Sequence, residues 1–218
     1  MKPLGGDRYQ IGNIVVDKRE RRITVPGHVA HLGEAPLEYL AVTTHGLKAY
    51  ETLLEADASG SEFNLALILI GFDSALSTRP DMQFDRRYPG GQVADIQVRW
   101  TLAGHTQTVS AEDALLSDAQ RKQLPAGRWI YIGSQILKAN YGRYGADLAG
   151  TLVGFVHDPN DVVEHRAGLG IGRYGSIVGN TALMPPAGSA VELILTATGE
   201  RVAPGPPPAP PARASHSH

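Results

Sequence analysis

The sequence contains no cysteine. This absence excludes disulfide bonds, iron–sulfur clusters, thiolate zinc sites and a cysteine nucleophile within this chain. An excess of charge of one sign is also missing, because 20 Lys and Arg residues stand against 22 Asp and Glu residues and give a net charge of −2. We therefore expect neither nucleic acid nor an anionic membrane surface as a partner.

Long apolar runs are absent as well. The most apolar segment, residues 61–70, is about half as long as the roughly 20 residues that a transmembrane helix requires. The opening sequence, MKPLGGDRYQ, lacks the apolar run of about 7 to 15 residues that is typical of a signal peptide. We expect no transmembrane segment and no signal peptide in this chain, so the protein either remains inside the cell or has lost a leader.

The composition indicates one folded domain followed by a tail. From residue 204 onward the sequence reads PGPPPAPPARASHSH, which has too little apolar surface to bury and predicts a disordered, polyproline-like segment. The remaining length suits a single domain. We divide the chain into an N-terminal extension at 1–9, one domain at 10–200 and a disordered Pro-rich tail at 201–218.

Residues 61–70 are predicted to form the central helix of the fold. Ser59 and Ser61 can accept hydrogen bonds from the first free N–H groups, and Glu62 favours the first turn. Gly71 can end the helix in the left-handed conformation. Between these signals the residues are apolar on nearly every side, so we expect the helix to be buried and covered by sheet.

Most of the rest of the chain shows the alternation of apolar and polar residues that strands require. The expected strands lie at residues 11–16, 22–25, 37–43, 48–54, 93–102, 106–109, 128–133, 151–156 and 190–196. In the clearest one, Ile96, Val98 and Trp100 share the face that should pack on the core. A second short helix is expected near residues 111–117, after a helix-start pattern. The predicted fold class is therefore α+β, predominantly antiparallel β with one buried central helix and a short second helix.

Two residues within the expected strands stand out. Glu38 would lie among apolar neighbours, and a buried carboxylate needs either a partner or a proton. Gly154 interrupts an otherwise apolar strand, which predicts a bulge or a position that another part of the chain approaches closely.

Several short blocks follow one another in order between residues 10 and 197. They include Leu37-Glu38, then Gly46, Lys48, Tyr50 and Glu51, then ALILIG at 66–71, then Trp129 with Tyr131, then Ala146-Asp147-Leu148, then Asp158-Pro159, and finally Pro185-Pro186, Gly188, Val191, Leu193 and Leu195. In this order the blocks resemble the YdjY-like domain family, whose bacterial members are commonly exported or lipid-anchored and have no established biochemical role. The resemblance implies an exported, periplasmic protein, while the residues alone leave a cytoplasmic location open.

Four polar residues within these blocks are candidates for a functional site: Lys48, Tyr50, Glu51 and Asp147. On a regular strand Lys48 and Tyr50 would share one face, and Glu51 would point to the other unless a bulge intervened. A carboxylate held near the core can have a raised pKa suited to proton transfer. The favoured alternative is a structural carboxylate that accepts hydrogen bonds from buried N–H groups.

Five potential metal ligands lie within nine residues: His157, Asp158, Asp161, Glu164 and His165. A turn could direct some of them at a hard or borderline cation. The favoured alternative is ordinary turn chemistry, in which Asp158 and Asn160 bond to nearby backbone and Pro159 fixes φ.

A convergent catalytic set does not stand out. Neither Ser134, in IGSQI, nor Ser61, in SGSEF, has the G-x-S-x-G context of a serine hydrolase. The expected function is a non-catalytic exported binding module, with no cofactor, for an unknown protein, envelope component or small ligand. The alternative is a metal-binding or metal-assisted enzyme that uses residues 157–165, so the sequence leaves open whether the protein is an enzyme.

Overall fold

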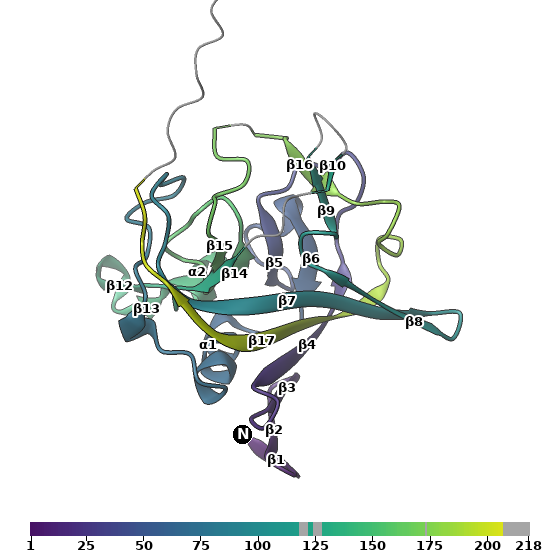
Figure 1. The fold of residues 1–218 in the computed structure, drawn as a ribbon, viewed down its shortest axis with the longest axis horizontal. Coiled ribbons are helices and arrows are strands. Elements are labelled where there is room, and N and C mark those ends of the chain that lie inside the picture. The colour runs from purple at the N-terminus through teal and green to yellow at the C-terminus, as the bar shows by residue number, and fades with distance from the viewer. Residues whose placement is uncertain (118–121, 124–127, 173, 207–218) are drawn as a thin grey trace, which may run out of the picture.

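The computed structural model describes residues 1–117, 122–123, 128–172 and 174–206, and within them the chain is mainly β-sheet. Eight strands form the framework: β4 (Arg22–Val29), β5 (Tyr39–Thr43), β6 (Thr52–Ala56), β7 (Gly91–Leu102), β11 (Trp129–Tyr131), β14 (Thr151–Gly154), β15 (Val163–His165) and β17 (Ala190–Val202). They pair in the order β4, β17, β7, β11, β15, β14, β5 and β6, and β6 pairs with β4 to close the ring (Figure 1). The β5–β6 and β14–β15 pairs are parallel, and the other pairs in the ring are antiparallel.

The remaining strands lie outside the ring. They are β1 (Lys2–Gly5), β2 (Arg8–Ile11), β3 (Ile14–Asp17), β8 (His105–Ser110), β9 (Leu115–Ser117), β10 (Lys122–Gln123), β12 (Ile136–Leu137), β13 (Arg143–Tyr144) and β16 (Ile177–Gly179). β3, β2 and β1 continue the sheet from β4, and β8 continues it from β7, so two ribbons project from the body (Figure 1). β10, β9 and β16 form a small separate sheet, and β12 pairs with β13. The predicted start of the domain at residue 10 falls within β2.

Closure of the ring depends on a close approach between β4 and β6. Gly27 lies opposite Ala56, and a Cβ atom on Gly27 would lie 2.3 Å from the carbonyl oxygen of Glu55. A side chain would force the two backbones apart, so glycine at this position permits the final pairing.

Apolar side chains from alternate strand positions fill the interior. In β7, Ile96, Val98 and Trp100 are buried while Asp95 is exposed, as the alternating sequence predicts. Burial of one such aliphatic side chain contributes about 1.5–3 kcal/mol. A ring of eight strands leaves an interior just wide enough for side chains.

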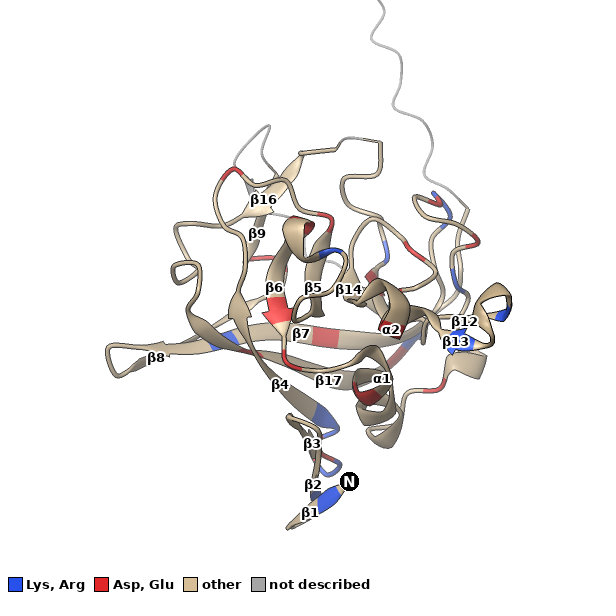
Figure 2. Ribbon diagram, turned by 180° about the vertical axis from the view of Figure 1, so that it is seen from behind, with Lys and Arg blue, Asp and Glu red and all other residues tan. Residues whose placement is uncertain are grey.

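The first helix, α1 (Gly60–Leu69), is not the buried centre of the fold. Phe63 and Leu67 are buried, but Leu65 and Ile68 are each 46% exposed. The helix contacts β3, β14 and the second helix, α2 (Gly145–Ala149), and lies beside the ring rather than within it (Figure 2). The prediction of a buried central helix is wrong because strand side chains already fill the ring.

The predicted ends of α1 are confirmed. Ser59 accepts from the N–H of Glu62, and the Glu62 carboxylate accepts from the N–H of Ser59, so the two form a reciprocal cap. Gly71, with φ of 104°, follows the helix in a conformation that favours glycine.

The second helix predicted near 111–117 is also wrong. The N–H of Asp113 does donate to the hydroxyl of Ser110 at 3.1 Å, but only one turn follows before β9 begins. Pairing of β9 with the distant β16 overrides the local helix signal. Within the described residues, no helix combines the length and apolar character needed to cross a membrane.

The α+β class predicted from the sequence is therefore incorrect. The described chain is mostly β, a closed barrel of eight strands with two α-helices outside it. Alternation in a sequence shows which face of a strand is buried, but not which strands meet to close a sheet.

The start of the predicted tail lies against the body. The backbones of Tyr88 and Gly205 exchange hydrogen bonds of 3.1 and 3.2 Å, and Arg166 Nη2 donates to the carbonyl of Ala203 at 3.1 Å. Residues 207–218 lie outside the described residues, so the disordered tail remains a prediction there.

Candidate functional site

The parallel strands β5 and β6 bring together the two chain segments that precede them. The N–H of Glu38 donates to the carbonyl of Glu51 at 2.9 Å, one position before Tyr39 pairs with Thr52. The side chain of Glu38 is buried, with the residue only 7% exposed, as its position in an apolar run predicts. A carboxyl in this environment requires a partner or a proton.

A tight turn places Lys48 and Glu51 together. The strand predicted at 48–54 begins late, because Ala49–Glu51 forms a 3₁₀ turn before β6. Residues three apart lie on the same side of such a turn, so Lys48 Nζ reaches Glu51 Oε1 at 2.6 Å. Lys48 Nζ also lies 3.5 Å from the hydroxyl of Tyr50. The structure thus brings three of the four candidate residues together, through a turn rather than a bulge.

Burial raises the pKa of Glu38 to about 7. The negative charges of Glu51 and Asp158 act in the same direction, and the positive charge of Lys48 opposes them. Burial lowers the pKa of Lys48, but its hydrogen bond to Glu51 and the charge of Glu51 outweigh that effect, so the pKa of Lys48 is raised. At neutral pH this corner therefore holds an ion pair beside a carboxyl that is only partly ionised.

Glu38 faces an open pocket of about 490 Å³, here named the Glu38 pocket. Its lining residues are Glu38, Phe84, Arg86, Gly170, Ile171, Gly172 and Tyr174. Phe84 is 44% exposed and Tyr174 is 68% exposed, so two aromatic rings are accessible to a ligand. Apolar walls with a few polar groups are typical of small-molecule sites.

The loop that carries Phe84 is held by the segment after β14. The N–H of Phe84 donates to the carbonyl of His157 at 2.8 Å, and His157 Nδ1 lies 2.6 Å from the carbonyl of Asp85. Phe84 and His157 have φ values of 62° and 63°, a region that non-glycine residues seldom occupy. Such strain persists where surrounding contacts hold it, and it often marks functional sites.

Asp158 connects this segment to β5. Its Oδ2 accepts from the hydroxyl of Tyr39 at 3.3 Å, and its Oδ1 accepts from both the N–H and the side-chain amide of Asn160 at 2.9 Å. The backbone N–H of Asp158 donates to the carboxylate of Glu164. Asp158 thus takes part in the turn chemistry expected from the sequence.

Asp161 and Glu164 are fully buried acids. Both carboxylate oxygens of Asp161 and one of Glu164 have no hydrogen-bond partner among the described residues. Burial, followed by the charge of Asp158, raises the pKa of Asp161 well above its usual range, and burial followed by the charge of Asp161 does the same for Glu164. Gly154 makes room for Asp161, since a Cβ on Gly154 would lie 1.7 Å from Asp161 Oδ2. The close approach predicted at this glycine is confirmed.

Of the two histidines of this segment, His157 has a partner at each ring nitrogen, whereas Nε2 of His165 has none among the described residues. His157 Nε2 lies 3.1 Å from the carbonyl of His165, so both ring nitrogens of His157 face backbone carbonyls. The ring of His165 packs edge-on against Trp129, and burial lowers the pKa of His165 to about 4. In the part of the chain that the structure describes, no three His, Asp or Glu side chains are placed to hold a metal ion. The five predicted ligands have no common centre.

Asp147 lies apart from the other candidate residues. It stands on α2, and its Oδ1 accepts from the N–H of Ser61 at 2.8 Å, in the first turn of α1. It lines a second pocket of about 460 Å³ together with Thr43, at the opposite end of β5 from Glu38. The grouping of Asp147 with Glu51 in one site is not found.

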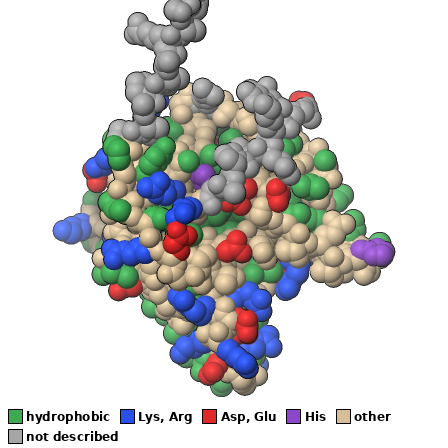
Figure 3. All heavy atoms as spheres, in the orientation of Figure 1, with side chains coloured by type: hydrophobic (Ala, Val, Ile, Leu, Met, Phe, Trp, Pro, Cys, Tyr) green, Lys and Arg blue, Asp and Glu red, His purple; other side chains and the backbone are tan. Residues whose placement is uncertain are grey.

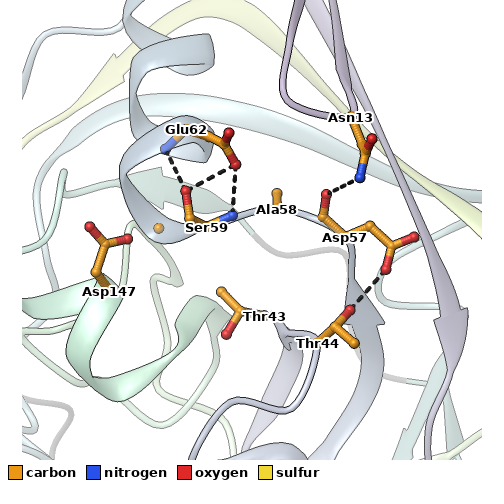
Figure 4. Close-up of a pocket in the computed structure, with 9 residues that line it drawn as sticks. Asn13, Thr43, Thr44, Asp57, Ala58, Ser59, Glu62 and Asp147 are labelled. Carbon is orange, nitrogen blue, oxygen red and sulfur yellow. Dashed lines mark hydrogen bonds between the residues drawn. The ribbon is translucent and has the colours of Figure 1, made fainter.

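The polar groups of this second pocket largely satisfy one another (Figure 4). Its lining residues are Asn13, Thr43, Thr44, Asp57, Ala58, Ser59, Gly60, Glu62 and Asp147. The hydroxyl of Thr44 donates to Asp57 at 2.9 Å, and Ser59 and Glu62 form the cap of α1. The arrangement is that of a capped helix start.

Charged side chains outside the pockets are interspersed rather than segregated on the face shown in Figure 3. Several form surface ion pairs, among them Arg99 with Glu192 at 2.6 Å and Arg128 with Glu200. Such exposed pairs contribute little to stability.

The sequence indicated Glu38 as a buried acid but not as a site residue, and it did not indicate Phe84, Arg86, Ile171 or Tyr174. Glycines around Ile171 signal a loop, but no local pattern shows that this loop and the one at Phe84 line the same pocket as Glu38. These contacts depend on the closed ring.

The fold and the site define a mostly-β domain with a pocket lined by an acidic residue, Glu38, and by aromatic side chains. The family model of the YdjY domain matches residues 14–196, and the chain belongs to that family. No curated protein and no solved structure matches the chain.

Proposed function

We propose that this YdjY domain is a non-catalytic, exported binding module that takes a small ligand in the Glu38 pocket. The observation that carries the proposal is the pocket itself, about 490 Å³, which the nearly buried Glu38 lines together with Phe84, Ile171 and Tyr174. Its size and mixture of aromatic and polar groups are those of a ligand site.

The nearby groups support binding rather than catalysis. Lys48 is held by Glu51 at 2.6 Å and its pKa is raised, so it stays protonated and is a poor nucleophile or general base. The hydroxyl of Ser134 is buried, donates to the carbonyl of Asn160 at 2.7 Å and accepts from the N–H of Ala146 at 3.0 Å. Neither residue is arranged as an activated nucleophile.

Export is part of the proposal and rests on the family. The YdjY-like proteins that the chain resembles are commonly exported, and a fold without cysteine is compatible with an oxidising compartment. Fractionation of the native host, with detection by an antibody, tests this part directly. Recovery with cytoplasmic markers alone would contradict it.

The binding proposal is tested by a fragment screen on ¹⁵N-labelled protein. We expect hits to shift the amide signals of Phe84, Ile171 and Tyr174 and to leave those of Thr44 and Ser59, in the second pocket, unchanged. Hits that shift only the second pocket, or a screen without hits, would contradict the proposal.

A pocket-filling variant gives the matched control. Ile171→Trp should abolish these shifts without lowering the melting temperature, because Ile171 is only partly buried. Ile136→Trp places the same ring at an exposed position outside the pocket and should bind as the unmodified protein does.

One observation favours the metal-binding alternative: buried oxygen and nitrogen atoms of Asp161, Glu164 and His165 have no hydrogen-bond partner among the described residues. Elemental analysis of tag-free protein, with melts in EDTA, Ca²⁺, Zn²⁺ and Mn²⁺, separates the two functions. Under the binding proposal the melting temperature stays constant. A stoichiometric metal, or a shift that disappears in Asp158→Ala and Asp161→Ala, would favour the alternative.

A further inference from the structure

We infer that the Glu38 pocket takes an amphoteric small molecule, with a protonated amine facing Glu38, an acidic group facing Arg86 and an apolar body between them. This inference rests on the proposed function and names the class of its ligand.

The amine group of the ligand is inferred from the charges around Glu38. The carboxyl lies near the negative charges of Glu51 and Asp158, and the cation close by, Lys48, is paired with Glu51 rather than with Glu38. Among the described residues no cation pairs with this nearly buried carboxyl, and such a carboxyl favours a ligand that supplies one.

Binding of an amine should also release a proton. Near neutral pH part of the Glu38 population is protonated, since its pKa is raised to about 7. The ammonium group stabilises the ionised form, so the carboxylic proton passes to solvent and an ion pair remains. Of the other titratable groups near this carboxyl, Lys48 and Tyr39 have raised pKa values, so neither loses a proton at this pH. Burial and then the charge of Asp158 also raise the pKa of the nearby Asp161, so proton release is compared in Glu38→Gln to assign the proton to Glu38.

The acidic group of the ligand is inferred from Arg86. Among the described residues Arg86 forms no ion pair, whereas the adjacent Arg87 is paired with both Asp81 and Asp85. Arg86 and Glu38 line the same pocket without pairing with each other. Gly172 leaves the guanidinium free space, because a Cβ there would lie 3.2 Å from Arg86 Nη2. A free guanidinium at a pocket wall suits a carboxylate or phosphate.

The apolar body of the ligand is inferred from the other side chains that line the pocket. Phe84 and Tyr174 expose their rings, and Ile171 adds an aliphatic surface. Aromatic walls favour a flat or apolar ligand body and can also contact a cation through their faces. The volume suits a molecule the size of an aromatic amino acid or a dipeptide.

The test uses three probes that share one ring. 4-(Aminomethyl)phenylacetic acid carries the amine and the acid at opposite ends, 4-methylbenzylamine lacks the acid, and 4-methylphenylacetic acid lacks the amine. Each is titrated into the ¹⁵N-labelled full chain at neutral pH, with the Phe84, Ile171 and Tyr174 signals as the readout. We expect the amphoteric probe to bind about tenfold more tightly than either relative, as one additional charge-assisted contact provides.

Two variants assign the ends. Glu38→Gln should weaken the two amine probes and spare 4-methylphenylacetic acid, and Arg86→Gln should weaken the two acid probes and spare 4-methylbenzylamine. Glu20→Gln and Arg19→Gln change exposed residues outside the pocket and should alter neither.

The possible failures are distinct. If all three probes bind equally, or if both variants keep the selectivity of the unmodified protein, the inference of an amphoteric ligand is overturned. The proposed function then still stands. Absence of binding by any probe at millimolar concentration also overturns it, and the fragment screen then decides the proposed function separately. Probe shifts confined to the second pocket would contradict both.

Discussion

Glu38 is the residue on which the account depends most. It precedes β5, donates its N–H to the carbonyl of Glu51 and lines the pocket. Nothing about a Leu-Glu-Tyr-Leu run distinguishes a structural acid from a ligand-binding one. The distinction comes from the neighbours, because Lys48 is already paired and Asp158 adds negative charge.

The raised pKa of Glu38 predicts a pH dependence of stability. Between the ordinary pKa of 4.5 and the raised value of about 7, the folded state holds a proton that the unfolded state has lost. The Glu38 contribution to the free energy of unfolding is therefore fully present below the lower value and falls as pH rises through the upper one. After a discount for partial solvation, the loss should be on the order of 1 to 2 kcal/mol.

Urea unfolding of the protein and of Glu38→Gln at pH 5 and pH 8 measures this contribution. The variant should gain stability relative to the unmodified protein as pH rises, because an amide cannot ionise. The comparison is necessary because His165, with its pKa lowered to about 4, gives an opposite slope at acidic pH. A difference that stays the same at both pH values, or one that also appears in Glu20→Gln, would contradict a raised pKa at Glu38.

Among the elements, α1 shows best how an apolar sequence can mislead. Its composition suggests burial on every side, yet Leu65 and Ile68 remain half exposed while Leu67 is fully buried. A helix packed on the outside of a closed ring can bury only one side.

This one-sided packing predicts different effects at two neighbouring positions of α1. Leu67→Asp places an unpaired charge in the core and should cost about 4 kcal/mol or more, enough to prevent folding of a marginally stable domain. Ile68→Asp changes an exposed position and should cost less than about 1 kcal/mol. Urea unfolding followed by circular dichroism gives both values. If the two variants are equally destabilised, α1 is buried on both sides after all.

The 3₁₀ turn before β6 is a second element with consequences for the site. Extended geometry at 48–54 would separate Lys48 from Glu51, and the turn instead joins them at 2.6 Å. The sequence supplies Lys48 and Glu51. The parallel pairing of β5 and β6 begins at Tyr39 and Thr52, so the residues before Thr52 are left to form a turn rather than a strand.

At the scale of the whole molecule, local features were predictable and closure was not. The faces of β7, the cap of α1 at Ser59 and the close approach at Gly154 follow from neighbouring residues. The β4–β6 pairing at Gly27 joins segments almost thirty residues apart, and no local pattern encodes it. The pocket could not be predicted from local sequence either, because Glu38, Phe84 and Tyr174 come together only after the ring has formed.

The closed ring also explains why the candidate residues divide into two groups. β5 extends from the Glu38 pocket at one end to the second pocket at the other, so Glu51, beside Glu38, and Asp147, in the second pocket, lie apart. Both residues belong to sequence blocks of the YdjY domain, but they do not belong to one site.

The most direct measurement is an NMR titration of the Glu38 carboxyl carbon, without and with 4-(aminomethyl)phenylacetic acid. The account predicts a midpoint of about 7 in the free protein and a lower midpoint when the probe is bound. A midpoint near the ordinary value of 4.5, unchanged by the probe, would contradict both the buried state of this carboxyl and its role in binding.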